Sequence, residues 1–565
     1  MEHMEQHDSI TASPNFPVTW ESPDDERLFW TRDTMHFPDQ MNELEGELVI
    51  RVAHAHGFAR ASEAYDMPIR LQPRRINTYY YMAVAPVMAP PEEMETMEER
   101  AQEKIGDAMV RLGETWSEDY LPEIQQYLQD WEDFDLRGAS MPELLAHLNE
   151  TLAKLQRLWE IHFFIAFPML MAISTFEEFY RDLFDSEGAF DAYRLLQGLD
   201  NKTVESGQML WQLSRKALEM PEVRKILTES AAADVVPALE GSAEGREFLM
   251  EFGAYLDEYG HRGDKWGVSY PTWTENPAPV IKMLKDYITQ PGGGPDEELA
   301  ALAAEREHHL AETRERLGGY PQTVRDQFEI LLKAAEEGTV LSEDHGFWID
   351  FNSTARVRKV FMEFGRRFAE ARVVEDPSDV FHLTLDEIRE TAEQLPNLDS
   401  MDLIAQRKAE IERFGRIQPP PALGTPPPGP PPDNPANRAL GKFFGGPPQP
   451  PDEAGILRGN PGSPGIVRGR AKVLRSLPEG NDGIKEGDIL VAETTAPPWT
   501  PLFATAAAVV TDTGGILSHC AVVAREYRIP AVVGTAMATA TIKDGQTIEV
   551  DGDKGVVRIL SEDGS

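Results

Sequence analysis

Proline dominates one stretch of this 565-residue chain. Fourteen of the 34 residues from 418 to 451 are proline. Because proline lacks a backbone N–H and fixes φ, the composition predicts neither a helix nor a central strand there and favours extended polyproline geometry. At about 3.1 Å per residue, a fully extended segment of this length spans on the order of 100 Å. The segment is either a passive linker or a tether that lets the domain after it move between two stations.

The linker divides the chain into three predicted parts. Residues 1–417 form a mainly helical domain, because apolar residues recur at three- and four-residue spacing, as at positions 105, 109, 112 and 116. Short strands and loops are expected before residue 90. Residues 418–455 form the linker. Residues 456–565 carry short β-rich runs separated by Gly and Asp turns, which predict a small α/β domain. The fold class is therefore multidomain.

Net charge and cysteine content narrow the functional classes. The formal net charge of −42 argues against nucleic-acid and anionic-membrane partners, which require basic surfaces. A single cysteine excludes an intramolecular disulfide and favours a reducing compartment. The first residues lack the basic and apolar regions of a signal peptide, so a cytoplasmic location is expected. The longest apolar tract, residues 161–173, is shorter than a membrane span, and Pro168 is predicted to break it into a buried helix pair.

A histidine follows a glycine pair in the last domain. Residues 506–510 predict a buried strand, Gly514 and Gly515 allow a tight turn, and Ser518 is a plausible N-cap for a helix that starts near His519. A helix N-terminus favours phosphate, and neutral imidazole is a competent nucleophile. We therefore expect His519 to carry a phosphoryl group, with Gly514, Gly515 and Ser518 binding phosphate. The alternative is that His519 only caps or packs.

The same segment resembles a known family. Gly-Gly-x-x-Ser-His-x-Ala-x-x-Ala-Arg-Glu at 514–526 and Ile-Pro-Ala-Val-Val-Gly at 529–534 are similar to the phosphohistidine segment of the phosphoenolpyruvate-utilising enzymes. This group includes phosphoenolpyruvate synthase, pyruvate phosphate dikinase, rifampin phosphotransferase and phenylphosphate synthase. The segments 463–465 and 487–492 resemble the same family's swivelling domain. The resemblance implies a swivelling β/β/α fold for residues 456–565. Leu517 stands where many members have a regulatory threonine, so that regulation is not expected here.

Further resemblance lies in the helical part. The segments 258–277 and 364–387 are similar to the helical domain of rifampin-phosphotransferase-like proteins, which implies that this domain binds the phosphoryl acceptor. His261 is the candidate base for the acceptor hydroxyl, and Arg262 is the candidate clamp for the transferred phosphoryl group. Arg74 and Arg75, in a looser likeness, are candidate substrate-binding residues. A helix-end hydrogen-bonding role is the alternative for His261 and Arg262.

No nucleotide site is evident in the sequence. A glycine-rich phosphate loop of the P-loop type does not occur, and the chain ends too soon after the swivelling domain for a pyruvate-binding barrel. The resemblance implies that a separate ATP-grasp-type subunit binds ATP and Mg²⁺, as in phenylphosphate synthase, and no metal site is predicted on this chain.

Three functions follow from these observations. The first is an ATP-dependent, dikinase-like phosphotransferase subunit that passes a phosphoryl group from His519 to a phenol-like or other apolar hydroxyl acceptor. The aromatic-rich tracts 79–81 and 163–171 suit such an acceptor, unless they simply form core. The alternatives are a phosphoenolpyruvate-synthase-like subunit that acts on pyruvate and a non-catalytic phosphocarrier or binding protein.

Overall fold

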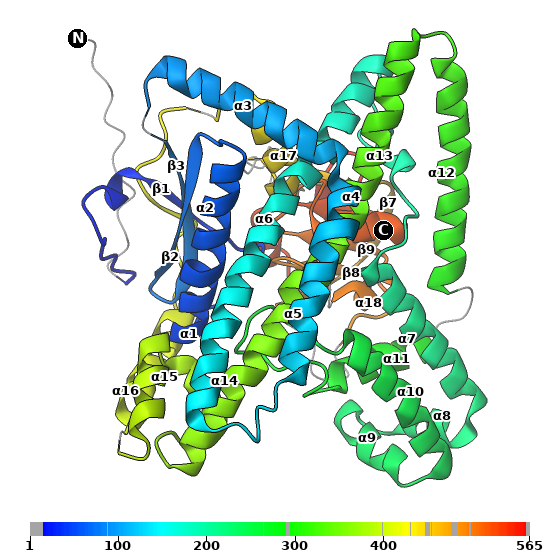
Figure 1. Cartoon of the computed structure of the whole chain (residues 1–565). Coiled ribbons are helices and arrows are strands. Elements are labelled where there is room, and N and C mark those ends of the chain that lie inside the picture. The colour runs from blue at the N-terminus through cyan, green and yellow to red at the C-terminus, as the bar shows by residue number, and fades with distance from the viewer. Residues whose placement is uncertain are drawn as a thin grey trace. The chain divides into compact units, whose positions relative to one another are not determined.

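The computed structural model describes residues 15–560 except 88, 264, 290–293, 398, 430, 447–452, 454, 476–482 and 497–498. The chain forms two compact units that interleave along the sequence (Figure 1). Unit 1 comprises Met1–Pro168, Gly267–Ser269 and Trp348–Pro432, and unit 2 comprises Met169–Trp266, Tyr270–Phe347 and Asp433–Ser565. This division does not test the predicted boundaries at 417/418 and 455/456, which stay predictions. The N-terminal residues and the prolines at 447–451 lie outside the described residues.

Unit 1 contains a four-stranded sheet with the strand order β2-β3-β1-β4. The strands are β1 (Phe29–Arg32), β2 (Ile69–Ile76), β3 (Tyr79–Pro86) and β4 (Ala422–Gly424). Tyr79 and Tyr81 are buried with Trp30 and Leu423 in its core, so this aromatic tract is core. Strand β4 comes from the proline-rich segment, where only an edge strand tolerates the missing N–H groups.

Helices surround this sheet in unit 1. They are α1 (Glu43–Gly46), α2 (Ala55–Ala64), α3 (Pro91–Val110), α4 (Leu112–Thr115), α5 (Leu121–Asp133), the first part of α6 (Met141–Phe184), α14 (Asn352–Glu370), α15 (Leu385–Gln394) and α16 (Met401–Gly415). The start of α15 is fixed by a capping box in which Thr384 and Glu387 satisfy each other's backbone N–H groups.

Helix α6 corrects one prediction. It runs unbroken through Pro168, so the expected helix pair is wrong, because an interior proline removes one hydrogen bond without ending a well-packed helix. Among the described residues, α6 is the one helix long and apolar enough to cross a membrane, with a window of mean hydropathy 1.5. Of that window, 56% is buried, as in many core helices, which makes it weak evidence for a span.

The helical part of unit 2 lies between the end of α6 and residue 347. It comprises α7 (Lys202–Glu219), α8 (Pro221–Glu229), α9 (Ala232–Glu240), α10 (Ala243–Tyr259), α11 (Ala278–Thr289), α12 (Pro295–Leu317) and α13 (Gln322–His345). Helices α7 to α11 pack against one another (Figure 1). The Asn201 side chain caps α7 by accepting from the N–H groups of Thr203 and Val204, which fixes where this helix starts.

The C-terminal part of unit 2 is built on an eight-stranded sheet, ordered β5-β12-β11-β7-β8-β9-β10-β6. Its strands are β5 (Ile456–Arg458), β6 (Asn460–Ser463), β7 (Ile466–Leu474), β8 (Asp488–Ala492), β9 (Ala508–Thr511), β10 (Ala531–Val533), β11 (Thr547–Asp551) and β12 (Val556–Ile559). Its short helices are α18 (Thr500–Phe503), α19 (His519–Glu526) and α20 (Ala538–Thr541). Strands β7, β8, β9 and β10 are parallel, and the other pairings are antiparallel. The predicted fold class, a mainly helical region followed by a small α/β domain, is confirmed.

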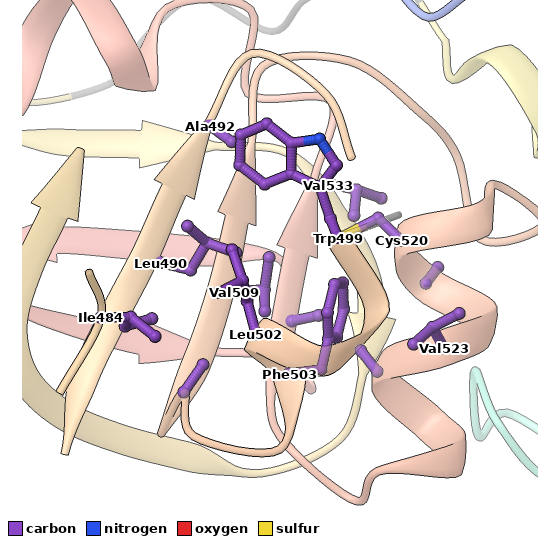
Figure 2. Packing of buried hydrophobic residues seen from close by; sticks show 14 of the residues in the cluster. Ile484, Leu490, Ala492, Trp499, Leu502, Phe503, Val509, Cys520, Val523 and Val533 are labelled. Carbon is purple, nitrogen blue, oxygen red and sulfur yellow. The ribbon is translucent and has the colours of Figure 1, made fainter. Parts of the chain in front are cut away.

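Both faces of this sheet are buried. Leu490, Val509 and Val533 point into one apolar cluster, in which Cys520 and Val523 of α19 pack against them (Figure 2). Their neighbours along the strands, such as Val491 and Val510, belong to a second cluster, because successive strand side chains point to opposite faces. Cys520 is thus a buried core residue, and α19 is anchored to the sheet through its own apolar side.

A helix inside the proline-rich segment corrects another prediction. Helix α17 (Pro435–Phe444) forms where no helix was expected. Its only proline stands in the first turn, where the missing N–H costs nothing, and the Asn434 side chain accepts from the N–H of Asn437 as its cap. Proline content alone was therefore a poor guide, because the residues that follow Pro435 are free of proline up to Gly446.

Candidate functional site

The loop before α19 is shaped by its two glycines. Gly514 has φ +103°, and a Cβ there would lie 2.7 Å from the Ser518 hydroxyl oxygen. A Cβ on Gly515 would lie 2.2 Å from the Lys442 carbonyl oxygen. Ser518 stands at the N-cap position as predicted, but its side chain makes no capping hydrogen bond. The loop thus delivers His519 as the first residue of α19, as the sequence indicated.

His519 is held by a carboxylate from the helical part of unit 2. Its Nδ1 lies 3.1 Å from Oε1 of Glu343, in the last turn of α13. The side chain of His519 is 16% exposed and that of Glu343 only 5%. The second oxygen, Oε2, accepts a hydrogen bond of 2.8 Å from the Thr203 hydroxyl in the first turn of α7. A buried carboxylate thus links three elements at the candidate nucleophile.

The protonation pattern follows from these bonds. Burial raises the pKa of Glu343, but the charge and hydrogen bond of His519, the Thr203 hydroxyl and the charge of Arg262 together hold it below its ordinary value. An ionised carboxylate only accepts hydrogen bonds, so Nδ1 of His519 carries the proton that points at it. The lone pair therefore resides on Nε2, which is buried and has no hydrogen-bond partner within the described structure.

Arg262 joins this electrostatic group. It is 2% exposed, and its guanidinium carbon lies 5.5 Å from the ring centre of Phe347 and 6.0 Å from that of Tyr259. Burial lowers its pKa, while Glu343 and the neighbouring acidic groups counteract that effect. His261 packs edge-on against the same Phe347 ring, with centroids 4.8 Å apart. The structure thus brings Arg262 into the field of Glu343, and the role of His261 as a base stays a prediction.

Arg74 and Arg75 lie in unit 1, on β2. The Arg74 guanidinium stacks over Trp30 at 5.6 Å and pairs with Glu21. Arg75 pairs with Glu43 at 3.0 Å and donates to the Met41 carbonyl, also at 3.0 Å. These contacts give both arginines a structural role within unit 1, and their predicted substrate-binding role stays untested.

The start of α19 suits a phosphoryl group. His519 Nε2 and Ser518 Oγ are both buried without a hydrogen-bond partner in the described part of the chain. Both lie beside the N–H groups of a helix N-terminus, which favour an anion. The Gly515 N–H, a predicted phosphate ligand, instead donates to the Phe443 carbonyl at 2.8 Å. Both oxygens of Glu343 already accept hydrogen bonds, so a Mg²⁺ ion here would compete with His519 and Thr203 for this carboxylate.

Helix α17 holds the loop before α19 through backbone hydrogen bonds. Its last carbonyls, of Lys442 and Phe443, accept from the N–H groups of Leu517 and Gly515. The Lys442 ammonium group in turn bonds three side chains near the end of α6: Ser174 (2.9 Å), Glu177 (2.6 Å) and Glu178 (3.0 Å). Arg438 adds a bidentate pair with Glu178 at 3.0–3.1 Å. The loop is therefore fixed to the helical part of unit 2 from two sides.

The far end of α19 makes further contacts with the helical part of unit 2. The Glu526 carboxylate accepts from the Gly198 N–H at 3.2 and 3.3 Å. Arg528, just after the helix, pairs with Glu305 at 3.0 Å. Burial raises the pKa of Glu526 to about 7. Both ends of α19 thus contact the helical part of unit 2.

Sequence reasoning missed Glu343, Thr203 and α17. Glu343 is 176 residues from His519, and nothing in its local pattern points to the histidine. The acidic pair Glu343–Asp344 is not a distinguishing signal either, because the same helix also carries Glu336–Glu337.

Comparisons with known proteins agree with this architecture. Residues 161–343 match the rifampicin phosphotransferase fourth domain, and residues 484–555 match the mobile domain of PEP-utilising enzymes. In this chain the segment similar to a rifampicin phosphotransferase domain therefore precedes the segment similar to a mobile domain of PEP-utilising enzymes. Both matched segments are similar to parts of PEP-utilising phosphotransferases.

Several curated proteins are similar to this chain. It is 41% identical to chondramide synthase cmdD of Chondromyces crocatus, over 99% of this chain and 14% of that protein. It is 31% identical to the uncharacterized phosphotransferase YvkC of Bacillus subtilis, over 71% of this chain and 47% of that protein. It is also 31% identical to a rifampicin phosphotransferase of Streptomyces sviceus, over 64% of this chain and 40% of that protein. The chain thus spans less than half the length of these relatives.

Proposed function

We propose that this chain is the acceptor-binding and phosphohistidine part of an ATP-dependent phosphotransferase. His519 receives a phosphoryl group from a nucleotide-binding part and passes it to a hydroxyl acceptor held by the helical part of unit 2. The observation that carries the proposal is the His519–Glu343 pair. It presents a buried Nε2, without a hydrogen-bond partner among the described residues, at a helix N-terminus and against the domain that resembles the fourth domain of rifampicin phosphotransferase.

The nucleotide site is assigned to a separate ATP-grasp-type subunit. Transfer from ATP needs Mg²⁺ to neutralise the developing charge, and bound Mg²⁺ prefers oxygen ligands that are free to coordinate. At His519 the nearest described carboxylate, Glu343, is committed to Thr203 and His519. Mg²⁺ therefore belongs with ATP on the partner, and the reaction is placed in the cytoplasm, where ATP is available.

A phenol-like or otherwise apolar alcohol is the proposed acceptor. Aromatic side chains gather around Arg262, among them Tyr259 and Phe347. Such a wall favours an apolar ring, while Arg262 supplies positive charge for the transferred phosphoryl group. His261, which packs edge-on against Phe347, is the proposed base for the acceptor hydroxyl.

Labelling from ATP tests this function. The purified chain is mixed with a purified ATP-grasp-type subunit, Mg²⁺ and ATP labelled at the β or the γ phosphate. The expected product is a label on the chain that is stable in alkali, labile in acid and absent from His519→Ala. Addition of phenols or alcohols should discharge it to a phosphorylated product. Discharge by pyruvate alone would contradict the hydroxyl acceptor, and label that persists in His519→Ala would contradict the site.

A further inference from the structure

The carboxylate behind His519 has a role that the histidine motif does not reveal. Resting on the proposed function, we infer that Glu343 is a positioning residue that keeps a proton on Nδ1 of His519. It thereby assigns the phosphoryl group to Nε2 and makes the imidazole a neutral leaving group when the acceptor is phosphorylated.

The geometry fixes the direction of this hydrogen bond. Oε1 of Glu343 faces Nδ1 at 3.1 Å, and Oε2 is held by the Thr203 hydroxyl at 2.8 Å. The carboxylate therefore cannot turn without losing one of its two partners. Since its neighbours keep it ionised, it binds the imidazole only through a protonated Nδ1. A carboxylate that orients a histidine in this way also selects its tautomer.

The backbone around Glu343 is fixed as well. The next residue, Asp344, accepts from the Lys202 N–H at 2.8 Å. Two consecutive residues in the last turn of α13 thus bond the first turn of α7, whose start is set by the Asn201 cap. This double attachment aims Glu343 at the position that His519 occupies.

The transfer step balances with the proton kept on Nδ1. The acceptor hydroxyl oxygen forms a bond to phosphorus, the P–Nε2 bond breaks, and its electron pair stays on Nε2. The hydroxyl proton leaves to solvent through the base. Nδ1 keeps its proton throughout, so the departing group is neutral imidazole. Without that proton an imidazolide anion would have to leave, which is a much poorer leaving group.

Other charged groups surround this pair. Arg262 follows α10, Lys202 and Glu205 lie on α7, Asp344 lies on α13, and Glu526 lies on α19. Their charges are of both signs, and Glu343 contributes to the raised pKa of Asp344 and of Glu526. A comparison of wild type with a Glu343 variant at each pH therefore reports the loss of the Glu343 charge together with these two pKa changes.

Glu343→Gln tests the inference, because the amide has the same shape but no charge. Potassium phosphoramidate, a small chemical donor, phosphorylates the histidine without any partner subunit. Nitrogen and phosphorus NMR identify the ring nitrogen that carries phosphorus, and discharge to phenol is timed across pH. Wild type should carry the phosphoryl group on Nε2. Glu343→Gln should discharge about tenfold or more slowly at neutral pH, and the difference should shrink in acid, where solvent protonates Nδ1 in both proteins.

Thr203→Val is the matched control, because it removes the other partner of the same carboxylate while leaving its charge. Discharge by Thr203→Val should stay within about threefold of wild type, a smaller loss than that of Glu343→Gln. Equal rates for wild type and Glu343→Gln at every pH would overturn the inference while leaving the proposed function intact. If Glu343→Gln does not fold, Glu343→Asp tests the same hydrogen bond in another way, because its shorter side chain withdraws the carboxylate from Nδ1 and should also slow discharge. Wild type that never forms phosphohistidine would instead overturn the proposed function.

Discussion

Replacing Glu526 with glutamine should stabilise the protein, and only above mildly acidic pH. Glu526 ends α19, and its carboxylate accepts from the Gly198 N–H at 3.2–3.3 Å. Glutamine keeps an oxygen for that hydrogen bond but carries no charge. Burial raises the pKa of the carboxyl from 4.5 to about 7, and the Gly198 N–H and Arg525 offset only part of that effect.

The magnitude and its sign follow from linkage. The folded protein holds the Glu526 proton more firmly than the unfolded chain does, so protonation favours the folded state. The corresponding stability is fully present below pH 4.5 and is lost as the pH rises through about 7. The difference between these pKa values corresponds to about 3 kcal/mol of unfolding free energy. Glutamine mimics the protonated form at every pH and should retain this stability.

Urea unfolding at about pH 5 and about pH 8 measures the effect. The two proteins share every other carboxyl group, so the difference between them reports on Glu526. Glu526→Gln should match wild type within about 1 kcal/mol at the lower pH and exceed it by about 3 kcal/mol at the higher pH. Hydrogen exchange of the α19 amides should show the same gain.

Glu305→Gln is the matched control for this prediction, because Glu305 also bonds the α19 end but is half exposed. It should change stability by less than about 1 kcal/mol at both pH values. A Glu526→Gln protein that is less stable than wild type at pH 8, or whose advantage is independent of pH, would refute the argument that this carboxyl is buried against Gly198.

Three further substitutions test the loop before α19 and its contacts with α17. Lys442→Glu should place a negative charge beside the carboxylates of buried Glu177 and of Glu178. The repulsion should lower the free energy that holds α17 in place by about 3 kcal/mol and raise the hydrogen-exchange rates of the loop before α19. Unchanged exchange rates would contradict the role of α17 in fixing this loop. Gly514→Ala should cost about 2 kcal/mol in thermal unfolding, because φ is +103° and its Cβ would contact Ser518; Gly446→Ala, whose Cβ would meet no described atom within 4 Å, is its control. Ser518→Ala should leave stability unchanged, since its hydroxyl has no partner among the described residues, but should slow phosphorylation by phosphoramidate about tenfold if that hydroxyl binds the phosphoryl group; equal rates would exclude it.

The sequence predicted the features that depend on residues close together in the chain. Short β-rich runs separated by Gly and Asp turns predicted the small α/β domain, and the glycine pair located the start of α19. Helix α17 escaped because proline was counted over the segment rather than by position, and Pro435 stands where a helix accepts it. The continuity of α6 through Pro168 was missed because the prediction took an interior proline as a helix breaker. A well-packed helix tolerates the loss of one hydrogen bond.

Of the His519–Glu343 pair, only the histidine could be predicted from the sequence. His519 belongs to a contiguous motif, but its partner Glu343 reaches it through the packing of α19 against α13 and α7, which no window of sequence contains. The sequence predicted that Arg262 holds the transferred phosphoryl group. In the structure the charge of Arg262 acts on Glu343, and its predicted role stays untested. Arg74 and Arg75 were candidates through a loose likeness to the substrate domain of rifampin-phosphotransferase-like proteins; in the structure they contact Trp30 and Glu43, and their predicted role stays untested.

The central claim is that His519 carries the phosphoryl group between ATP and the acceptor. The most direct measurement is a rapid-quench time course with labelled ATP, the ATP-grasp-type subunit and a phenol, in which the label on the His519 peptide is quantified by mass spectrometry beside the product. The label on His519 should appear before the product and decay at the rate at which product forms, and His519→Ala should make neither. Product that forms without labelled His519, or at the same rate in His519→Ala, would contradict the account.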